Sequence, residues 1–119
     1  MGHHLAQINI GRFRLPIDHP TNADFVDSLD RVNALADAQP GFVWRLKGEG
    51  SSAIDIRAFD DPHVALNMSV WTGLEALADF VYRNPEHRAI MRRRREWFDR
   101  METYMALWWV PEGHLPTIA

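Results

Sequence analysis

The chain of 119 residues has no cysteine, a single lysine and no long apolar run. The absence of cysteine excludes disulfides, thiol catalysis and any thiolate metal site. No stretch reaches the roughly 18 apolar residues of a membrane-spanning helix, and the N-terminus lacks the apolar segment of a signal peptide. We therefore expect a cytoplasmic protein that does not contact a membrane.

Positive charge is also scarce. The 16 acidic residues outnumber the 13 basic ones and give a net charge of −3. With this balance the chain as a whole lacks the excess positive charge that is typical of nucleic-acid-binding proteins. We therefore expect no nucleic acid as a partner. What the chain does have is 46% hydrophobic residues and five tryptophans, enough to build a core. Without linkers or repeats, it is expected to form one domain over residues 1–119.

Hydrophobic periodicity predicts the element order strand, helix, strand, strand, helix, strand. The predicted strands cover residues 5–10, 42–47, 66–71 and 104–110, with a weaker edge strand or extended loop at 54–59. Two helices are predicted to open with capping boxes, in which Thr21 pairs with Asp24 and Thr72 with Glu75. This order matches an α+β, ferredoxin-like split βαβ domain with helices on one face of an antiparallel sheet.

The segment 84–101 is predicted to be one helix, with Asn84 as its cap and Pro85 at its first position. Its apolar stripe contains Ile90, Met91, Trp97, Phe98 and Met101. His87 and Arg94 fall within this stripe, where charged groups are uncommon. Because a guanidinium keeps its proton, Arg94 is expected to meet a carboxylate, cap backbone carbonyls, border a wet cavity or contact an anionic ligand.

The faces of the sheet are expected to differ. If the apolar positions Ala6, Ile8, Ile10, Leu66, Met68 and Val70 pack on the helices, the opposite face displays Gln7, Asn9, Asn67, Ser69 and Trp71. Trp44, Trp108 or Trp109 would add to that face. A mixture of polar groups and large aromatic rings suits a partly wet cavity or an interface, so we expect two sheets to meet face to face in a homodimer.

Several segments resemble the DUF3291 family of unknown function. They are residues 40–46 (PGFVWRL), 69–71 (SVW), 80–83 (FVYR), 92–98 (RRRREWF) and 107–111 (LWWVP). The resemblance covers nearly the whole chain, and the arginine-rich segment is the most specific part. It implies the dimeric α/β-barrel superfamily, in which two ferredoxin-like subunits enclose a barrel cavity and which includes cofactor-free monooxygenases and haem-degrading enzymes.

The haem-degrading branch is similar in using an Asn on the first strand, a Trp at the end of the third and a His on the following helix as iron ligand. By this resemblance Asn9, Trp71 and His87 would hold haem, although His87 lies sixteen residues past Trp71, further than that branch suggests. The alternative is a neutral histidine buried near a helix N-terminus and bonded to backbone. Apart from His87 with haem, no metal site is predicted.

Three functions remain open. The first is a monooxygenase-like enzyme with a small hydrophobic or aromatic substrate, in which Asn9 orients the oxygen and His87 or Arg94 stabilises an enolate or phenolate. Substrate contacts are expected from Trp71, Asn67, Trp44 and Trp108, although Trp44 and Trp108 also suit the core or a dimer interface. The second is a haem protein with His87 as ligand, and the third is a non-catalytic binding homodimer. Cofactors are therefore none or haem.

The remaining arginines of the 92–95 run are expected to form a solvated, salt-bridged face. Arg92 with Glu96 and Arg95 with Asp99 have the i,i+4 spacing of helical ion pairs. We favour this interpretation over an anion-binding site.

Overall fold

Four antiparallel strands form one sheet in the order β2-β3-β1-β4. The computed structural model describes residues 2–16, 18–47, 63–99 and 105–117. The strands are β1 (His3–Arg12), β2 (Phe42–Arg45), β3 (Val64–Trp71) and β4 (Met105–Pro111). Because β3 pairs antiparallel with both β1 and β2, these two run parallel with β3 between them. This is the split βαβ arrangement predicted from the element order.

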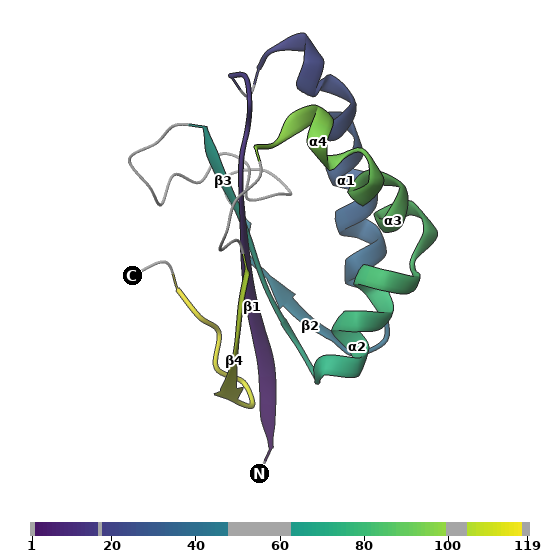
Figure 1. Ribbon diagram of the computed structural model, residues 1–119. Coiled ribbons are helices and arrows are strands. Elements are labelled where there is room, and N and C mark those ends of the chain that lie inside the picture. The colour runs from purple at the N-terminus through teal and green to yellow at the C-terminus, as the bar shows by residue number, and fades with distance from the viewer. Residues whose placement is uncertain (1, 17, 48–62, 100–104, 118–119) are drawn as a thin grey trace.

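The helices lie together on one side of the sheet (Figure 1). The 3-10 turn η1 (Pro20–Asn22) leads into α1 (Ala23–Ala38). Between β3 and β4 follow α2 (Leu74–Ala78), the π-helical turn η2 (Asp79–Arg83), α3 (Pro85–Arg92) and α4 (Arg94–Trp97). Helix α1 packs on β2 and α2 on β3, whereas no helix packs extensively on β4 in the described part of the chain. The helical layer therefore covers the sheet unevenly.

The predicted strands agree with the observed ones to within a few residues. The segment 54–59 lies outside the described residues. The predicted Thr21 and Thr72 caps are wrong, because Asn22 precedes α1 and Gly73 precedes α2, and neither makes a side-chain cap hydrogen bond. The Asn84 cap has the predicted form, since its Oδ1 accepts from the backbone N–H groups of Glu86 and His87 at 3.0 and 3.1 Å.

The single helix predicted over 84–101 is also wrong. Arg93 leaves the helical conformation (φ −94°, ψ 2°), and Phe98 is extended and bridges to Phe13. The rings of Phe13 and Phe98 lie 4.6 Å apart, and a Cβ on Gly11 would come within 2.7 Å of the Phe98 ring. At this point the packing of aromatic rings against the end of β1 replaces further helical hydrogen bonds. Met101 lies outside the described residues.

The sheet faces are the reverse of those predicted. Leu5 and Trp71, which oppose one another in the β1–β3 register, form a core with Ala36, Leu77 and Phe80 from the helical layer. The side chains of β1 and β3 that lie two and four positions from Leu5 and Trp71 share their face, so Gln7, Asn9, Asn67 and Ser69 also face the helices. The apolar set lies on the other face, where Ala6, Val70 and Val110 pack with Trp44 and Trp108. Hydrophobic alternation located the two faces, but both faces bury residues, so alternation alone did not identify the helical side.

Candidate functional site

A row of amide and hydroxyl side chains lies beneath the helices on the two central strands. We call Gln7, Asn9, Asn67 and Ser69 the amide row. Cross-strand pairing sets Gln7 opposite Ser69 and Asn9 opposite Asn67. Gln7 and Ser69 are buried, whereas Asn9 and Asn67 are half-buried.

Gln7 is the centre of the row. Its Nε2 donates to Asn67 Oδ1 and to Ser69 Oγ, both at 2.7 Å. Its Oε1 accepts from Asn9 Nδ2 at 3.3 Å. These bonds occupy the oxygen of Asn67 and leave both hydrogens of its Nδ2 without an acceptor among the described residues. Asn67 Nδ2 therefore has two N–H donors without a protein acceptor there, whereas Asn9 Nδ2 has one, because its other hydrogen is bonded to Gln7.

Trp71 extends the amide row into the aromatic core. Its Nε1 donates to Ser69 Oγ at 2.8 Å, and its side chain is 2% exposed. The Trp71 ring stacks on Phe80 at 5.7 Å and meets Phe42 edge-on at 5.4 Å. A buried indole with a satisfied N–H is rigid, so Trp71 holds Ser69 in place.

His87 adjoins this core through Phe80, with the two ring centres 4.9 Å apart. Its Nδ1 lies 3.0 Å from the carbonyl oxygen of Val81. In an α-helix that carbonyl would accept from residue 85, but Pro85 has no N–H. His87 therefore hydrogen-bonds to the Val81 carbonyl that Pro85 leaves unpaired. This is the backbone-bonding role expected from the sequence as the alternative to haem ligation.

The same contact sets the protonation of His87. Burial lowers the pKa of His87 below its ordinary value, and the hydrogen bond to Val81 opposes this only in part. The ring is then neutral near pH 7, with the proton on Nδ1 because that nitrogen faces a carbonyl. The lone pair of Nε2 has no protein partner in the described ranges. A neutral imidazole with an available lone pair suits a general base or a metal ligand.

Arg94 does not lie where the sequence predicted it. The helix break at Arg93 turns Arg94 to the surface, where its Nη1 donates to the Met91 carbonyl at 2.8 Å. It thus caps backbone carbonyls, one of the roles expected for it, and the expectation of a place in the apolar stripe is wrong. Its catalytic role has no structural support, and we leave it out of the proposed site.

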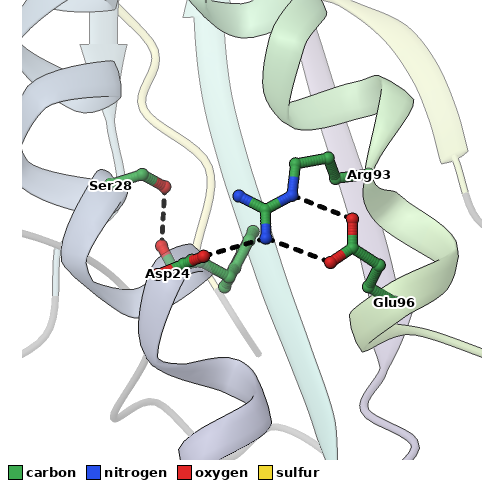
Figure 2. A network of polar contacts seen from close by, with 5 residues as sticks. Asp24, Ser28, Arg93 and Glu96 are labelled. Atoms are coloured by element: carbon green, nitrogen blue, oxygen red, sulfur yellow. Dashed lines mark hydrogen bonds and ion pairs between the residues drawn. The ribbon is translucent and has the colours of Figure 1, made fainter.

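The ion pairs of the arginine-rich segment 92–95 also differ from the expected ones. Arg93 joins α4 to α1 by donating to Glu96 at 2.8 and 3.0 Å and to Asp24 at 2.9 Å (Figure 2). Its guanidinium lies 4.8 Å from the ring centre of Trp97 and lowers the pKa of Glu96. The predicted pairs of Arg92 with Glu96 and Arg95 with Asp99 are wrong, since Asp99 binds Arg12 instead.

The tryptophans divide between the two sides of the sheet. Trp44 and Trp108, which we expected to contact substrate, lie half-buried on the face away from the helices. Trp109 shares the helical side of the sheet with the amide row and is 60% exposed. From the sequence, Trp109 was only one of three tryptophans that could add to the polar face. Alternation along β4 places Trp108 and Trp109 on opposite faces of the sheet. Assigning Trp109 to the helical side required knowing which face the helices cover.

Two open cavities near β2 do not contain the amide row. One, of about 410 Å³, is lined by residues 37 and 42–47 and includes Trp44. The other, of about 420 Å³, lies beside Gly41 and Thr72. His87 lines neither of them. The Nε2 of His87 could serve chemically as a haem ligand, but neither of these two cavities lies beside it.

Other site classes find no support among the described residues. No group of three or more acidic or histidine side chains is arranged to hold a metal ion there. Within the same residues, no helix is both long enough and apolar enough to cross a membrane.

Comparison with known proteins agrees with this fold. The family described as "Domain of unknown function (DUF3291)" matches residues 4–119. No curated protein matches the chain. Among solved structures, the chain is similar to SnoaB from Streptomyces nogalater, described as a cofactor-independent oxygenase, with 19% identity and a TM-score of 0.59 over 98% of this chain and 100% of that one.

Two further structures have the same fold. Rv0793 from Mycobacterium tuberculosis has 13% identity and a TM-score of 0.62 over 96% of this chain and 99% of its own. PA3566 from Pseudomonas aeruginosa has 12% identity and a TM-score of 0.61 over 96% and 98%. At such low identity these likenesses establish the ferredoxin-like fold alone and leave activity to be argued from the site.

Proposed function

The chain belongs to the DUF3291 family of unknown function, and we propose that it is a cofactor-free, monooxygenase-like enzyme for a small hydrophobic or aromatic substrate. The observation that carries the proposal is the amide row. Placing four polar side chains beneath a helical layer, two of them buried and two half-buried, lowers stability unless they are well paired. Here the pairing aligns Asn67 Nδ2 as a donor with no protein acceptor in the described residues, the arrangement that a substrate oxygen requires.

We assign the chemistry as follows. His87 Nε2 accepts a proton from an acidic C–H of the substrate, and Asn67 Nδ2 donates to the neighbouring substrate oxygen as negative charge develops there. The resulting carbanion transfers one electron to dioxygen, and the substrate radical and superoxide join in a C–O bond. Protonation gives a hydroperoxide, which loses water to leave a carbonyl. In total, CH₂ and O₂ become C=O and H₂O.

The other members of the row position these groups. Gln7 holds the Asn67 amide in the orientation that presents its N–H donors. Trp71 fixes Ser69, and through Phe80 it connects the row with the ring of His87. Asn9, which we expected from the sequence to orient the oxygen, donates one of its two amide N–H groups to Gln7 and is a supporting residue in this proposal.

The test uses anthrone, a fused-ring ketone with an acidic CH₂, and follows oxygen uptake and anthraquinone absorbance. We expect the rate to exceed that without protein. Asn67→Leu should lower kcat/KM by about 10²–10³-fold, and His87→Gln by about 10²–10⁴-fold. Ile8→Val, on the opposite face of β1, is the control. Uptake equal to the protein-free rate for anthrone and related fused-ring phenols would contradict the proposal.

Haem binding is the second candidate, favoured by the tautomer of His87. Histidine ligands to metals commonly donate their other N–H to a carbonyl, as Nδ1 does to Val81 here. The test is the absorption spectrum of protein purified from cells supplied with a haem precursor. A Soret band that is lost in His87→Ala would establish His87 as ligand, whereas its absence after haemin addition would remove this candidate.

We also propose a homodimer. Its support is the sheet face away from the helices, where large side chains such as Ile8, Trp44 and Trp108 are half-buried. Two copies of this face could cover one another about a two-fold axis, as in other isologous dimers. Light scattering should give twice the chain mass at micromolar concentration, and a monomer would contradict the shared barrel.

A further inference from the structure

Five exposed arginines lie on or beside helices α3 and α4 without an acidic partner among the described residues. We call them the arginine surface, and they are Arg14, Arg88, Arg92, Arg94 and Arg95. From the sequence we expected Arg92 and Arg95 to pair with Glu96 and Asp99. Because neither pair forms, a salt-bridged face no longer explains this concentration of positive charge.

The acidic residues of the same stretch are bonded to other arginines. Three of them lie between positions 85 and 99. Glu86 accepts two hydrogen bonds from Arg31 on α1, both at 2.9 Å. The other two partners are Arg93 for Glu96, as Figure 2 shows, and Arg12 for Asp99. None of these three carboxylates contacts the arginine surface.

The like charges of the arginine surface are unfavourable by themselves. Arg88 and Arg92 are one helical turn apart on α3, a spacing at which like charges lower the stability of a helix. Arg94 and Arg95 follow within three residues of Arg92, so four guanidiniums project from a short stretch of chain. An occupant of opposite charge would relieve this repulsion.

Backbone carbonyls hold two of the guanidiniums in place. Arg94 Nη1 donates to the Met91 carbonyl at 2.8 Å, and Arg14 Nη1 donates to the Arg95 carbonyl at 3.2 Å. Both side chains therefore stay beside the junction of α3 and α4. A guanidinium has further N–H donors for a second acceptor, and an ordered side chain loses less conformational entropy when it binds one.

The size of the arginine surface favours a short acidic segment as the occupant. Arg88 and Arg92 are about 6 Å apart along the helix axis, since each residue of a helix rises about 1.5 Å. Residues on one face of an extended segment are about 6.7 Å apart, a similar spacing. Carboxylates also match the planar fork of a guanidinium. A long polyanion would extend past this surface onto a chain whose net charge is −3.

We infer that the arginine surface is a docking site for a partner protein that presents a short segment with acidic residues at alternate positions. The carboxylates of this segment would bond to Arg88, Arg92 and Arg95. These arginines are exposed, whereas the amide row lies beneath the helices. The inference therefore goes beyond the proposed function and does not depend on it.

The experiment measures the fluorescence anisotropy of a labelled peptide in which Glu and Ser alternate. A peptide with Gln in place of Glu is the ligand control. The test variants are Arg92→Gln, Arg95→Gln and the double variant. The matched control is Arg83→Gln, because Arg83 is an exposed arginine of the same helical layer whose charge is paired with Asp79. Thermal unfolding checks that each variant folds.

We expect the Glu peptide to bind and the Gln peptide not to bind. Each single variant should raise the Kd about 3–5-fold and the double variant about 10-fold or more, whereas Arg83→Gln should change it less than about 2-fold. Raising the salt concentration from about 0.05 to 0.5 M should also weaken binding, because it screens exposed charges. The Tm of Arg92→Gln should be equal to or higher than that of the unaltered protein, since a repulsion is removed.

The remaining outcomes would overturn the inference. Absence of binding by the Glu peptide, or equal weakening in Arg83→Gln, would show that the arginine surface is only solvated. An oligothymidylate or vesicles of phosphatidylglycerol serve as competing polyanions. Tighter binding of either one than of the Glu peptide, with the same dependence on Arg92 and Arg95, would exclude an acidic protein segment as the preferred occupant.

Discussion

Trp71 and Trp109 flank the same residue of β1 but have opposite surroundings. Both oppose Leu5, Trp71 from β3 and Trp109 from β4, and both face the helical side of the sheet. Trp71 is 2% exposed and packed between Phe42 and Phe80, whereas Trp109 is 60% exposed. The difference follows from the helices, which pack on β2 and β3 and not extensively on β4. One half of this face is packed beneath the helices, and the other half is exposed in the described part of the chain.

Removing each of these two rings should give the largest contrast. Trp71→Ala should lower the free energy of unfolding by about 3–5 kcal/mol, because it leaves a large cavity in the core. Trp109→Ala should change it by about 0.5 kcal/mol or less, because the ring is exposed. Urea unfolding followed by circular dichroism measures both. Equal losses in the two variants would show that the β4 half is covered in solution.

Among the described residues, two glycines with positive φ extend the comparison to the ends of the strands. Gly41, before β2, has φ +88°, and a Cβ there would collide with Ala76. Gly113, after β4, has φ +84° with open space around it. Gly113→Ala should cost about 1–2 kcal/mol from backbone strain, and Gly41→Ala about 1–3 kcal/mol more from overpacking. A smaller loss for Gly41→Ala in thermal unfolding would contradict close packing of α2 on the β2 side.

Within the amide row, burial decreases from Gln7 to Asn9. Gln7→Ala should destabilise the protein by about 1–3 kcal/mol, because Asn67 and Ser69 lose their shared donor below the helices. Asn9→Ala should cost less than about 1 kcal/mol, because Asn9 is half-buried and makes one long hydrogen bond. Chemical denaturation of the two variants tests this order, and the reverse order would place the centre of the network at Asn9.

The smallest effect concerns pH and His87. Because burial lowers the pKa of His87 in the folded state, the unfolded chain binds the proton more readily. The stability from neutral His87 is fully present above about pH 6.5 and declines as the pH falls toward the folded pKa. The free energy of unfolding should therefore fall less between pH 7 and 5 in His87→Gln than in the unaltered protein. Parallel pH profiles would show that His87 is not desolvated.

Much of the fold could be predicted from the sequence, because strands and helices leave clear periods and the segment order allowed few topologies. The arrangement of the sheet faces could not. Ala6, Ile8 and Ile10 alternate with Leu5, Gln7 and Asn9, and the rule that apolar residues face the helices selected the wrong set. Gln7 and Asn9 are acceptable there because they bond to one another and to β3, and a single sequence does not show these partners.

The candidate site was predicted in part. Asn67, Trp71 and His87 lie on the helical side, where a shared site is feasible, and their roles stay predictions. Arg94 was misplaced because the helix breaks at Arg93 so that Trp97 and Phe98 can pack, a tertiary effect that overrides helical periodicity. Trp44 and Trp108 were misplaced together with the sheet face they occupy.

The central claim is that ligand binds to the helical side of the sheet, the side that carries Asn67 and Trp109. The most direct test is a titration of ¹⁵N-labelled protein with 1-naphthol, followed through the indole N–H resonances of the five tryptophans. We predict that the Trp71 and Trp109 resonances shift with one common Kd, while those of Trp44, Trp97 and Trp108 stay in place. Shifts confined to Trp44 and Trp108 would place the ligand on the opposite face and contradict the account.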